Sequence, residues 1–521
     1  MSARVRMFRN VVDSGEIVFE PDVTCLVGKN ESGKTSVLQA LYRLNPAPVP
    51  SIFDEFDDYP RWRYVEDRRD GLISQTQPIA CSFELEDEDV AAVVEELGPR
   101  VLRSRTLKRA VAYSGEAFIG IDVDESAALT NYFERAHISE DLRSLFKLGS
   151  SPEDVKEGKA FVDGLDAKME AEAKALADQV ALRFQNGSAW SIAKEILKRR
   201  IPQFFYFSEY EILPGRIELA KLFSNNQEPG QSSLQTARAL LRLSGAEQEV
   251  LTAEQFERRK AELEAVSSKL SREVARYWTQ NDNLLVEIDT DNAAVQSEPG
   301  QTSLVRYLDV RVRDTRHGFT GNFTQRSSGF QWFFSFLAAF SEFEDRGHGV
   351  IVLLDEPALN LHGLAQADFL RFINERLAAN SQVIYATHSP FMVESSRLDR
   401  VRVVEDKGMD LGSVVGQDVY AAGSDSLLPL RAALGHDIAQ NLSLGPENEL
   451  VEGTTDLSGL RTMRDHLTAA GEQEQVTPAR TRKKQERSWR FWESDGWWGF
   501  LERVGLASRS PRGGDRRGRR R

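Results

Sequence analysis

The chain has few of the features that mark secreted or membrane proteins. Its 521 residues include only two cysteines, Cys25 and Cys81, so we expect no disulfide framework and favour a reducing compartment. No apolar run approaches the roughly 20 residues that span a bilayer. The first residues also lack the apolar segment of a secretory signal. We therefore expect a cytoplasmic protein without a membrane partner.

An overall positive charge is also missing. The net charge is −14, although residues 480–521 contain 14 Lys and Arg against 5 Asp and Glu. An acidic body does not attract nucleic acid as a whole, so any contact with DNA requires local basic patches. Each candidate patch also fits an ordinary solvated face. The candidates are Arg100, Arg103, Arg105, Lys108 and Arg109, and a second group of Lys194, Lys198, Arg199 and Arg200.

A phosphate-binding loop is the clearest motif that is present. Residues 28–35 read Gly-Lys-Asn-Glu-Ser-Gly-Lys-Thr and fit G-x-x-x-x-G-K-[ST], between an apolar strand at 22–27 and a helix at 36–42. Lys34 would reach the β- and γ-phosphates of ATP, and the Thr35 hydroxyl would bind Mg²⁺. The expected nucleotide-binding residues are Gly28, Asn30, Ser32, Gly33, Lys34, Thr35 and Ser36.

An acidic partner for this loop follows a second apolar strand. Residues 350–354 are all apolar, and Asp355 and Glu356 come directly after them. Ligands bind at the carboxyl ends of strands in α/β sheets. We expect Asp355 to bind Mg²⁺ through water and Glu356 to orient and deprotonate the attacking water. The alternative, a strand that ends in two surface acids, is disfavoured by the phosphate loop upstream.

Two further segments complete the expected site. His388 ends another buried strand, where it would sense the γ-phosphate rather than act as a structural histidine. Ser327, Ser328 and Gly329 open an apolar helix at 330–340, and such a helix N-terminus suits an anion.

These four elements, in this order, resemble the ATP-binding-cassette ATPases of the Rad50, SMC and OLD branch. The resemblance implies an α/β, ABC-type P-loop ATPase with a large helical insertion. It makes residues 327–329 the signature motif, residues 358–362 the dimer-interface loop and His388 the switch histidine. The signature differs from the usual Leu-Ser-Gly-Gly-Gln. Because a signature acts on the ATP of a second subunit, a homodimer or higher homo-oligomer is implied.

A segment near the C-terminus resembles the start of a Toprim nuclease domain. A short apolar strand precedes Glu452, and Asp456 lies four positions later. In OLD-family nucleases such residues bind Mg²⁺, or Mn²⁺, for phosphodiester cleavage. An ordinary turn is the alternative. No apolar strand ending in Asp-x-Asp follows Asp456, so the module looks truncated.

Together these resemblances imply an OLD-family ATPase that couples ATP-driven dimer closure to DNA binding or cleavage, in phage defence. One alternative is a nuclease-inactive sensor or clamp that works with a separate effector protein. Another is a Rad50- or SMC-like DNA repair ATPase, which the lack of sustained heptads disfavours.

The expected domain organisation follows the motifs. Residues 46–75 read as irregular, residues 254–278 as a helix packed on the body rather than a paired arm, and β-type patterning returns at Leu304. The expected domains are an ATPase N-terminal lobe at 1–150, a mainly helical insertion or dimerisation region at 151–300, an ATPase C-terminal lobe at 301–405, a linker with a partial Toprim-like segment at 406–470, and a basic, disordered Trp- and Arg-rich tail at 471–521.

Overall fold

The computed structural model describes residues 1–417, except for 48–50, 185–187, 209–211, 224–231, 244–255, 279, 282, 299–300, 341–348 and 360. Two compact units divide the chain, at residues 1–450 and 451–521. Because the described residues end at 417, Glu452, Asp456 and the expected tail lie outside them.

A seven-stranded sheet in the order β17-β16-β4-β15-β14-β9-β5 forms the centre of the first unit. Its neighbours pair in parallel, except for the antiparallel edge pair β16–β17. All residues of the central strands β4, β14 and β15 are buried, as expected for a parallel sheet covered on both faces. The strands are β4 (Val23–Val27), β5 (Pro46–Ala47), β9 (Gln203–Phe207), β14 (Val350–Asp355), β15 (Val383–Thr387), β16 (Val401–Asp406) and β17 (Ser413–Gly416).

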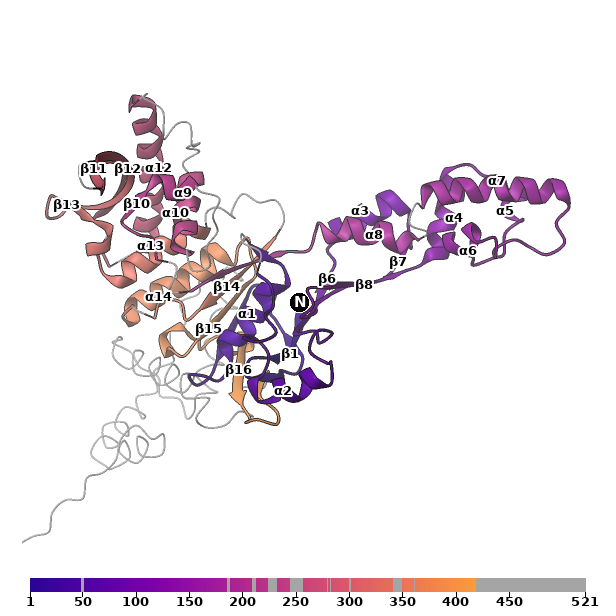
Figure 1. Cartoon of the computed structure of the whole chain (residues 1–521), viewed down its shortest axis with the longest axis horizontal. Helices are drawn as coiled ribbons and strands as arrows, with labels where there is room; N and C mark the ends of the chain where they lie inside the picture. The colour runs from indigo at the N-terminus through magenta and orange to yellow at the C-terminus, as the bar shows by residue number, and fades with distance from the viewer. Residues whose placement is uncertain are drawn as a thin grey trace, which may run out of the picture. The chain divides into compact units, whose positions relative to one another are not determined.

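Helices cover both faces of this sheet (Figure 1). One face packs against α1 (Lys34–Leu44), and the other against α13 (Ser328–Phe340) and α14 (Gly363–Phe372). The second face is rich in aromatic side chains, with Trp332 4.8 Å from Phe369 between ring centroids. The short helices that follow in this part of the chain are η3 (Ile373–Leu377), η4 (Pro390–Met392) and η5 (Leu398–Arg400).

A second, six-stranded sheet has the order β2-β1-β6-β7-β8, with β3 paired to β1. All its pairs are antiparallel. Helix α8 packs on β8 and α3. The strands are β1 (Ser2–Phe8), β2 (Val11–Asp13), β3 (Ile17–Val18), β6 (Ile79–Glu84), β7 (Leu102–Val111) and β8 (Ala117–Val123). The helices are α2 (Arg61–Arg69), α3 (Asp87–Leu97), α4 (Glu125–Arg135), α5 (Glu140–Arg143), α6 (Pro152–Lys156), α7 (Ala167–Arg183) and α8 (Ala189–Lys198).

A third sheet, of four antiparallel strands, has the order β10-β12-β11, with β13 paired to β12. Helix α12 packs on β11 through Leu263, Val266, Leu270 and Val274, all of which are buried. This confirms the packed helix expected at 254–278. The elements are β10 (Arg216–Glu218), α9 (Leu219–Phe223), α10 (Ser232–Leu243), α12 (Phe256–Tyr277), β11 (Leu284–Glu298), β12 (Gln301–Asp314), β13 (Phe319–Asn322) and η2 (Phe323–Gln325).

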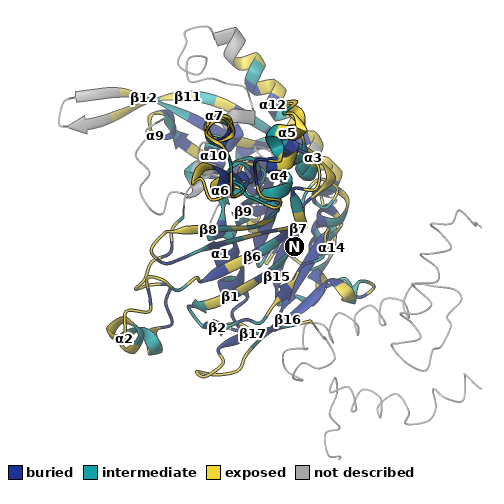
Figure 2. Ribbon diagram, turned by 90° about the vertical axis from the view of Figure 1, so that its right-hand side faces the viewer, coloured by how far each residue is buried: buried dark blue, intermediate teal, exposed yellow. Residues whose placement is uncertain are grey.

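The α/β fold expected from the sequence is confirmed, but two local expectations are wrong. Helix α2 forms within the segment 46–75 that reads as irregular. It buries none of its residues, so it has no apolar stripe that a helical pattern could reveal (Figure 2). The β-type structure also begins earlier than Leu304, with β11 at Leu284. The domain boundaries themselves stay a prediction.

Both cysteines are free and buried, in agreement with the absence of a disulfide framework. Burial raises the pKa of the Cys25 thiol to about 12. Among the described residues, no helix has the length and apolar character needed to cross a bilayer.

Candidate functional site

The phosphate loop joins the end of β4 to the start of α1, and two glycines allow it to close tightly. A Cβ at Gly28 would lie 2.3 Å from the carbonyl oxygen of Val404, and one at Gly33 would lie 2.5 Å from Ser413 Oγ. Gly33 also has a φ of 102°, a backbone angle that residues with a side chain rarely adopt. No side chain caps the N-terminus of α1. The helix end therefore keeps its positive dipole and backbone N–H groups available for an anion.

Two buried side chains in the loop carry polar groups that a phosphate chain could contact. Lys34 is buried, and its Nζ donates to the carbonyl oxygens of Gly28 at 3.0 Å and Lys29 at 2.9 Å. Its charge is offset by the Glu356 carboxylate, whose Oε1 lies 3.5 Å from Nζ. Ser32 Oγ is also buried and has no hydrogen-bond partner among the described residues. Both groups fit the oxygens of a bound phosphate chain.

Thr35 and Asp355 meet although they are far apart in the sequence. The Thr35 hydroxyl donates to Asp355 Oδ1 at 3.0 Å across a separation of 320 residues. The sheet brings them together, because β15 lies between β4 and β14 and all three strands run in the same direction. Hydroxyl and carboxylate oxygens are the hard ligands that Mg²⁺ prefers. The donor set therefore fits Mg²⁺ shared with nucleotide phosphates.

The described residues contain no group of three or more His, Cys, Asp or Glu side chains that could hold a metal ion. Two protein oxygens alone would hold Mg²⁺ weakly. Mg²⁺ in nucleotide sites usually takes its other ligands from phosphates and water. This part of the chain thus fits a metal that arrives with the nucleotide rather than a metal held by the protein alone.

Glu356 and His388 form a close pair beside Lys34. Glu356 Oε2 lies 2.8 Å from His388 Nδ1 and accepts the backbone N–H of His388 at 3.2 Å, while Oε1 lies 3.5 Å from Lys34 Nζ. Glu356 has a φ of 47°, in the left-handed region. Such a backbone costs about 1–3 kcal/mol and is common at functional sites. The strained turn directs the carboxylate toward the loop and the histidine.

The electrostatics of the site favour a bound cation. Burial raises the pKa of Asp355 above its usual range. The hydroxyls of Tyr206 and Thr35 act against this rise, the charge of Glu356 adds to it, and the charge of Lys34 opposes it. A cation at Asp355 would stabilise the ionised carboxylate that burial disfavours.

The signature residues do not join this cluster. Ser327 and Ser328 are exposed at the start of α13, and Gly329 is buried. The Ser327 hydroxyl accepts the N–H of Phe330 at 3.4 Å, a contact within its own segment. In the expected interface loop, Leu359 is 39% exposed, whereas Ala358 and Leu361 are buried; residue 360 lies outside the described residues.

Four of the nine basic residues expected to contact DNA are engaged with neighbours, whereas Arg100 and Lys108 are exposed. Three arginines pair with carboxylates: Arg103 with Asp124 at 3.2 Å, Arg105 with Asp87 at 2.5 Å and Arg200 with Asp89 at 3.2 Å. Lys194 Nζ lies over the ring of Trp190, 4.9 Å from the ring centroid. Lys198, the last residue of α8, and Arg199, which follows the helix, are exposed. The solvated-face interpretation is therefore favoured at the paired positions.

Three polar residues that the sequence does not mark support the site. The Asn10 amide donates to the Glu31 carbonyl at 3.2 Å and accepts the Ser36 hydroxyl at 2.7 Å, so it braces the outer side of the phosphate loop. The backbone of Asn10 also accepts the N–H of Ser413, in β17. No motif contains Asn10, and only the tertiary contact reveals its role.

Gln366 and Tyr206 are the other two. Gln366 donates to the carbonyls of Ala358 and Leu361, both at 3.0 Å, and accepts the Ser389 hydroxyl at 2.5 Å. It therefore connects the expected interface loop to the residue after His388. The Tyr206 hydroxyl donates to Asp355 Oδ2 at 2.8 Å.

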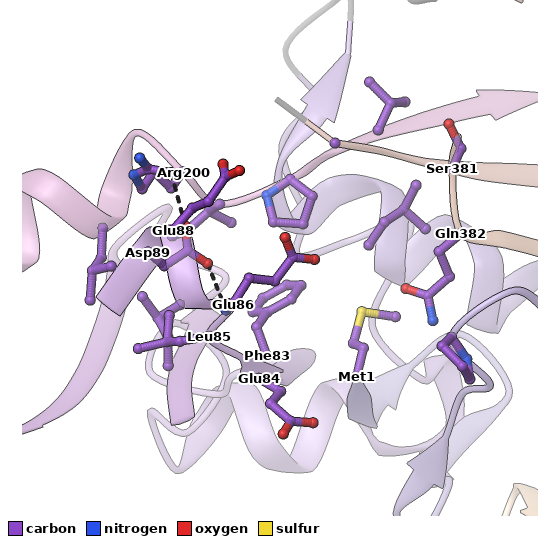
Figure 3. A pocket seen from close by; sticks show the side chains of 18 of the residues that line it. Met1, Phe83, Glu84, Leu85, Glu86, Glu88, Asp89, Arg200, Ser381 and Gln382 are labelled. Carbon is purple, nitrogen blue, oxygen red and sulfur yellow. Dashed lines mark hydrogen bonds and ion pairs between the residues drawn. The ribbon is translucent and has the colours of Figure 1, made fainter. Parts of the chain in front are cut away.

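A cavity with a volume of about 920 Å³ lies elsewhere. Figure 3 shows Glu86, Asp89 and Arg200 on one wall and Ser381 and Gln382 on another. Its lining includes the first residues of β14 and the residues just before β9 and β15, so it is at the opposite edge of the sheet from the phosphate loop. This cavity is therefore separate from the candidate nucleotide site.

Comparison with known proteins identifies one family. Residues 2–393 match the model described as AAA ATPase domain. No curated protein matches the chain.

Solved structures of SMC head domains show some likeness. One is an SMC head bound to the C-winged helix domain of ScpA, with 12% identity, 80% of this chain and 95% of that chain covered, and a TM-score of 0.37. Another is the SMC head domain from Thermotoga maritima, with 13% identity, 80% and 97% coverage, and a TM-score of 0.32. A third, from Pyrococcus furiosus, has an extended coiled coil and is bound to the C-terminal domain of ScpA, with 13% identity, 80% and 94% coverage, and a TM-score of 0.35. TM-scores this low carry no functional argument.

The bracing by Asn10 can be tested against a matched control. Asn45, at the other end of α1, donates to the carbonyls of Ile201 and Pro202. Each alanine variant should lose about 1–2 kcal/mol of unfolding free energy. Only Asn10→Ala should also weaken ATP binding, by about 5–10-fold, because a loosened loop must be ordered again on binding. Equilibrium binding of a fluorescent ATP analogue measures this. Equal affinities of the two variants would contradict the role of Asn10.

Proposed function

The chain belongs to the AAA ATPase domain family, and from this premise we propose that it binds Mg²⁺ and ATP at the phosphate loop and hydrolyses the ATP. The observation that carries the proposal is the convergence of Lys34, Thr35, Asp355, Glu356 and His388 at one edge of the central sheet. Phosphoryl transfer to water requires groups that bind the phosphates, hold the metal and activate the water. These five side chains supply such groups.

Each side chain has a distinct role in this proposal. Lys34 exchanges its carbonyl partners for the β- and γ-phosphates. Thr35 and Asp355 would hold Mg²⁺, which when bound would supply positive charge against the phosphate oxygens. Glu356 accepts a proton from the attacking water, and His388, hydrogen-bonded to Glu356, positions that carboxylate and contacts the γ-phosphate. The contacts of Glu356 with Lys34 and with His388 support this assignment.

We further propose that a second copy of the chain completes the site. The exposed hydroxyls of Ser327 and Ser328, at the N-terminus of an apolar helix, support a contact made in trans. Bound ATP would then join two subunits, and hydrolysis would release them. The interface loop, which follows Glu356 and is tied to Ser389 through Gln366, provides a route from chemistry to the interface.

The finer proposal is that closure of this dimer acts on DNA, as the OLD-family resemblance implies. Exposed Lys198 and Arg199 support a local contact with the phosphate backbone. The metal-binding roles of Glu452 and Asp456 belong to this proposal and lie outside the described residues. An ATPase that works with a separate effector would have the same nucleotide site and no cleavage.

A Rad50- or SMC-like repair ATPase is also consistent with the nucleotide site. Such a protein carries a long coiled-coil arm. The longest described helix is α12, with 22 residues, and it packs on the body. This observation favours the OLD-like proposal over the repair ATPase.

The proposed chemistry predicts different defects for two substitutions. Glu356→Gln should keep ATP binding and lower turnover by about 10²–10⁴-fold, because the general base is lost. It should also accumulate an ATP-bound dimer, measured by light scattering after gel filtration. Lys34→Ala should lower turnover by at least about 100-fold and form no such dimer. A Glu356→Gln protein that stays monomeric with saturating ATP would contradict completion of the site in trans.

Coupling to DNA is tested with the same two proteins. The ATP-bound Glu356→Gln dimer should bind duplex DNA about 10-fold or more tightly than Lys34→Ala under the same conditions, a typical allosteric coupling. Plasmid cleavage in Mg²⁺ or Mn²⁺ that Glu452→Ala abolishes would support the nuclease. ATP-dependent DNA binding without cleavage would favour the separate effector, and no binding in either state would reject the role on DNA.

A further inference from the structure

The Asp355 carboxylate accepts hydrogen bonds on both oxygens. Thr35 donates to Oδ1 at 3.0 Å, and Tyr206 donates to Oδ2 at 2.8 Å. Thr35 belongs to the phosphate loop, whereas Tyr206 belongs to no nucleotide-binding motif. It lies in β9, on the far side of β14 from the phosphate loop strand.

The alternation of side chains along β9 directs Tyr206 to the face of the sheet that α1 covers. Its neighbours Phe205 and Phe207 are buried on the opposite face. There the ring centroid of Phe207 lies 5.7 Å from that of Trp332 and 5.3 Å from that of Phe336. On the α1 face, the Tyr206 ring lies 5.7 Å from that of Tyr42. Packing against Tyr42 therefore helps to hold the phenol ring in place, independently of the hydrogen bond from its hydroxyl to Asp355.

Helix α1 adds a second polar contact. Gln39 Nε2 donates to the Tyr206 hydroxyl at 3.4 Å, which leaves the phenol proton directed at Asp355. Gln39 lies one helical turn after Thr35, so the same helix supports both donors to the carboxylate. A carboxylate held on one oxygen can rotate about its last bond, whereas one held on both oxygens has a single orientation.

We propose that Tyr206 is a positioning residue, which fixes the orientation of Asp355 so that Oδ1 faces Thr35 and the metal that enters with ATP. This inference rests on the proposed function, because it assigns Mg²⁺ to Thr35 and Asp355. Tyr206 acts on metal affinity rather than on nucleotide contacts. Outer partners of metal ligands commonly change metal affinity by about 10–100-fold.

The test separates the hydroxyl from the ring. Tyr206→Phe keeps the packing against Tyr42 and removes the hydroxyl, which is the donor to Asp355 and the acceptor of the weaker 3.4 Å contact from Gln39. Tyr59→Phe is a matched control, since Tyr59 is buried and its hydroxyl donates to the carboxylate of Asp67 at 2.7 Å, outside the site. Thermal unfolding of both variants reports the cost of losing one tyrosine–aspartate hydrogen bond.

Binding of a fluorescent ATP analogue to the full chain is then measured as Mg²⁺ is titrated, and again in EDTA. In Tyr206→Phe the half-saturating Mg²⁺ concentration should rise by about 10-fold. Affinity for the analogue in EDTA should match that of the wild-type protein. Tyr59→Phe should match the wild-type protein in both measurements.

Three outcomes have distinct meanings. A Tyr206→Phe protein with the wild-type dependence on Mg²⁺ overturns the inference while the proposed function stands. Weaker binding in EDTA by the same factor also overturns it, because the tyrosine would then support the loop rather than the metal ligand. A wild-type protein whose binding does not respond to Mg²⁺ refutes the proposed function itself.

Discussion

The hydrogen bond between the Thr35 hydroxyl and Asp355 is the contact on which the site depends, because it joins segments 320 residues apart. Neither residue could reach the other without the parallel register of β4, β15 and β14. The three strands end at one edge, where they deliver the phosphate loop, His388 and the two acids. The buried sheet fixes these positions, since a shift by one residue would turn every strand-end side chain to the other face.

This arrangement concentrates charge where water is scarce. Lys34 and Asp355 are both buried, and Glu356 is held in a left-handed backbone conformation beside His388. Burial of an ammonium group and of a carboxylate is costly, and Lys34 has Glu356 at 3.5 Å while Asp355 has the hydroxyls of Thr35 and Tyr206 to offset that cost. Binding of Mg²⁺ and ATP would add an opposite charge to both groups together. The free-energy cost of holding these charged groups in place is met when the chain folds. It therefore does not have to be met again when the nucleotide binds.

The sequence predicted the parts of this site that are encoded by contiguous patterns. The phosphate loop, the strand before Asp355 and the strand before His388 each combine an apolar run with a polar end, and the structure brings these three segments together. Asn10, Gln366 and Tyr206 could not be predicted, because their contacts arise from tertiary register and no local pattern requires them. Helix α2 could not be predicted for another reason, since it lacks a buried stripe. The basic patches were proposed from charge alone, and only the structure reveals the carboxylates that pair with Arg103, Arg105 and Arg200.

The most direct test of the account is whether a metal ion joins ATP to Thr35 and Asp355. Mn²⁺ can replace Mg²⁺, and pulsed electron paramagnetic resonance of the full chain with a non-hydrolysable ATP analogue detects phosphorus nuclei coupled to the bound ion. The account predicts a phosphorus-coupled Mn²⁺ signal that Asp355→Asn abolishes or strongly weakens. A phosphorus-coupled signal that is unchanged in Asp355→Asn would contradict it.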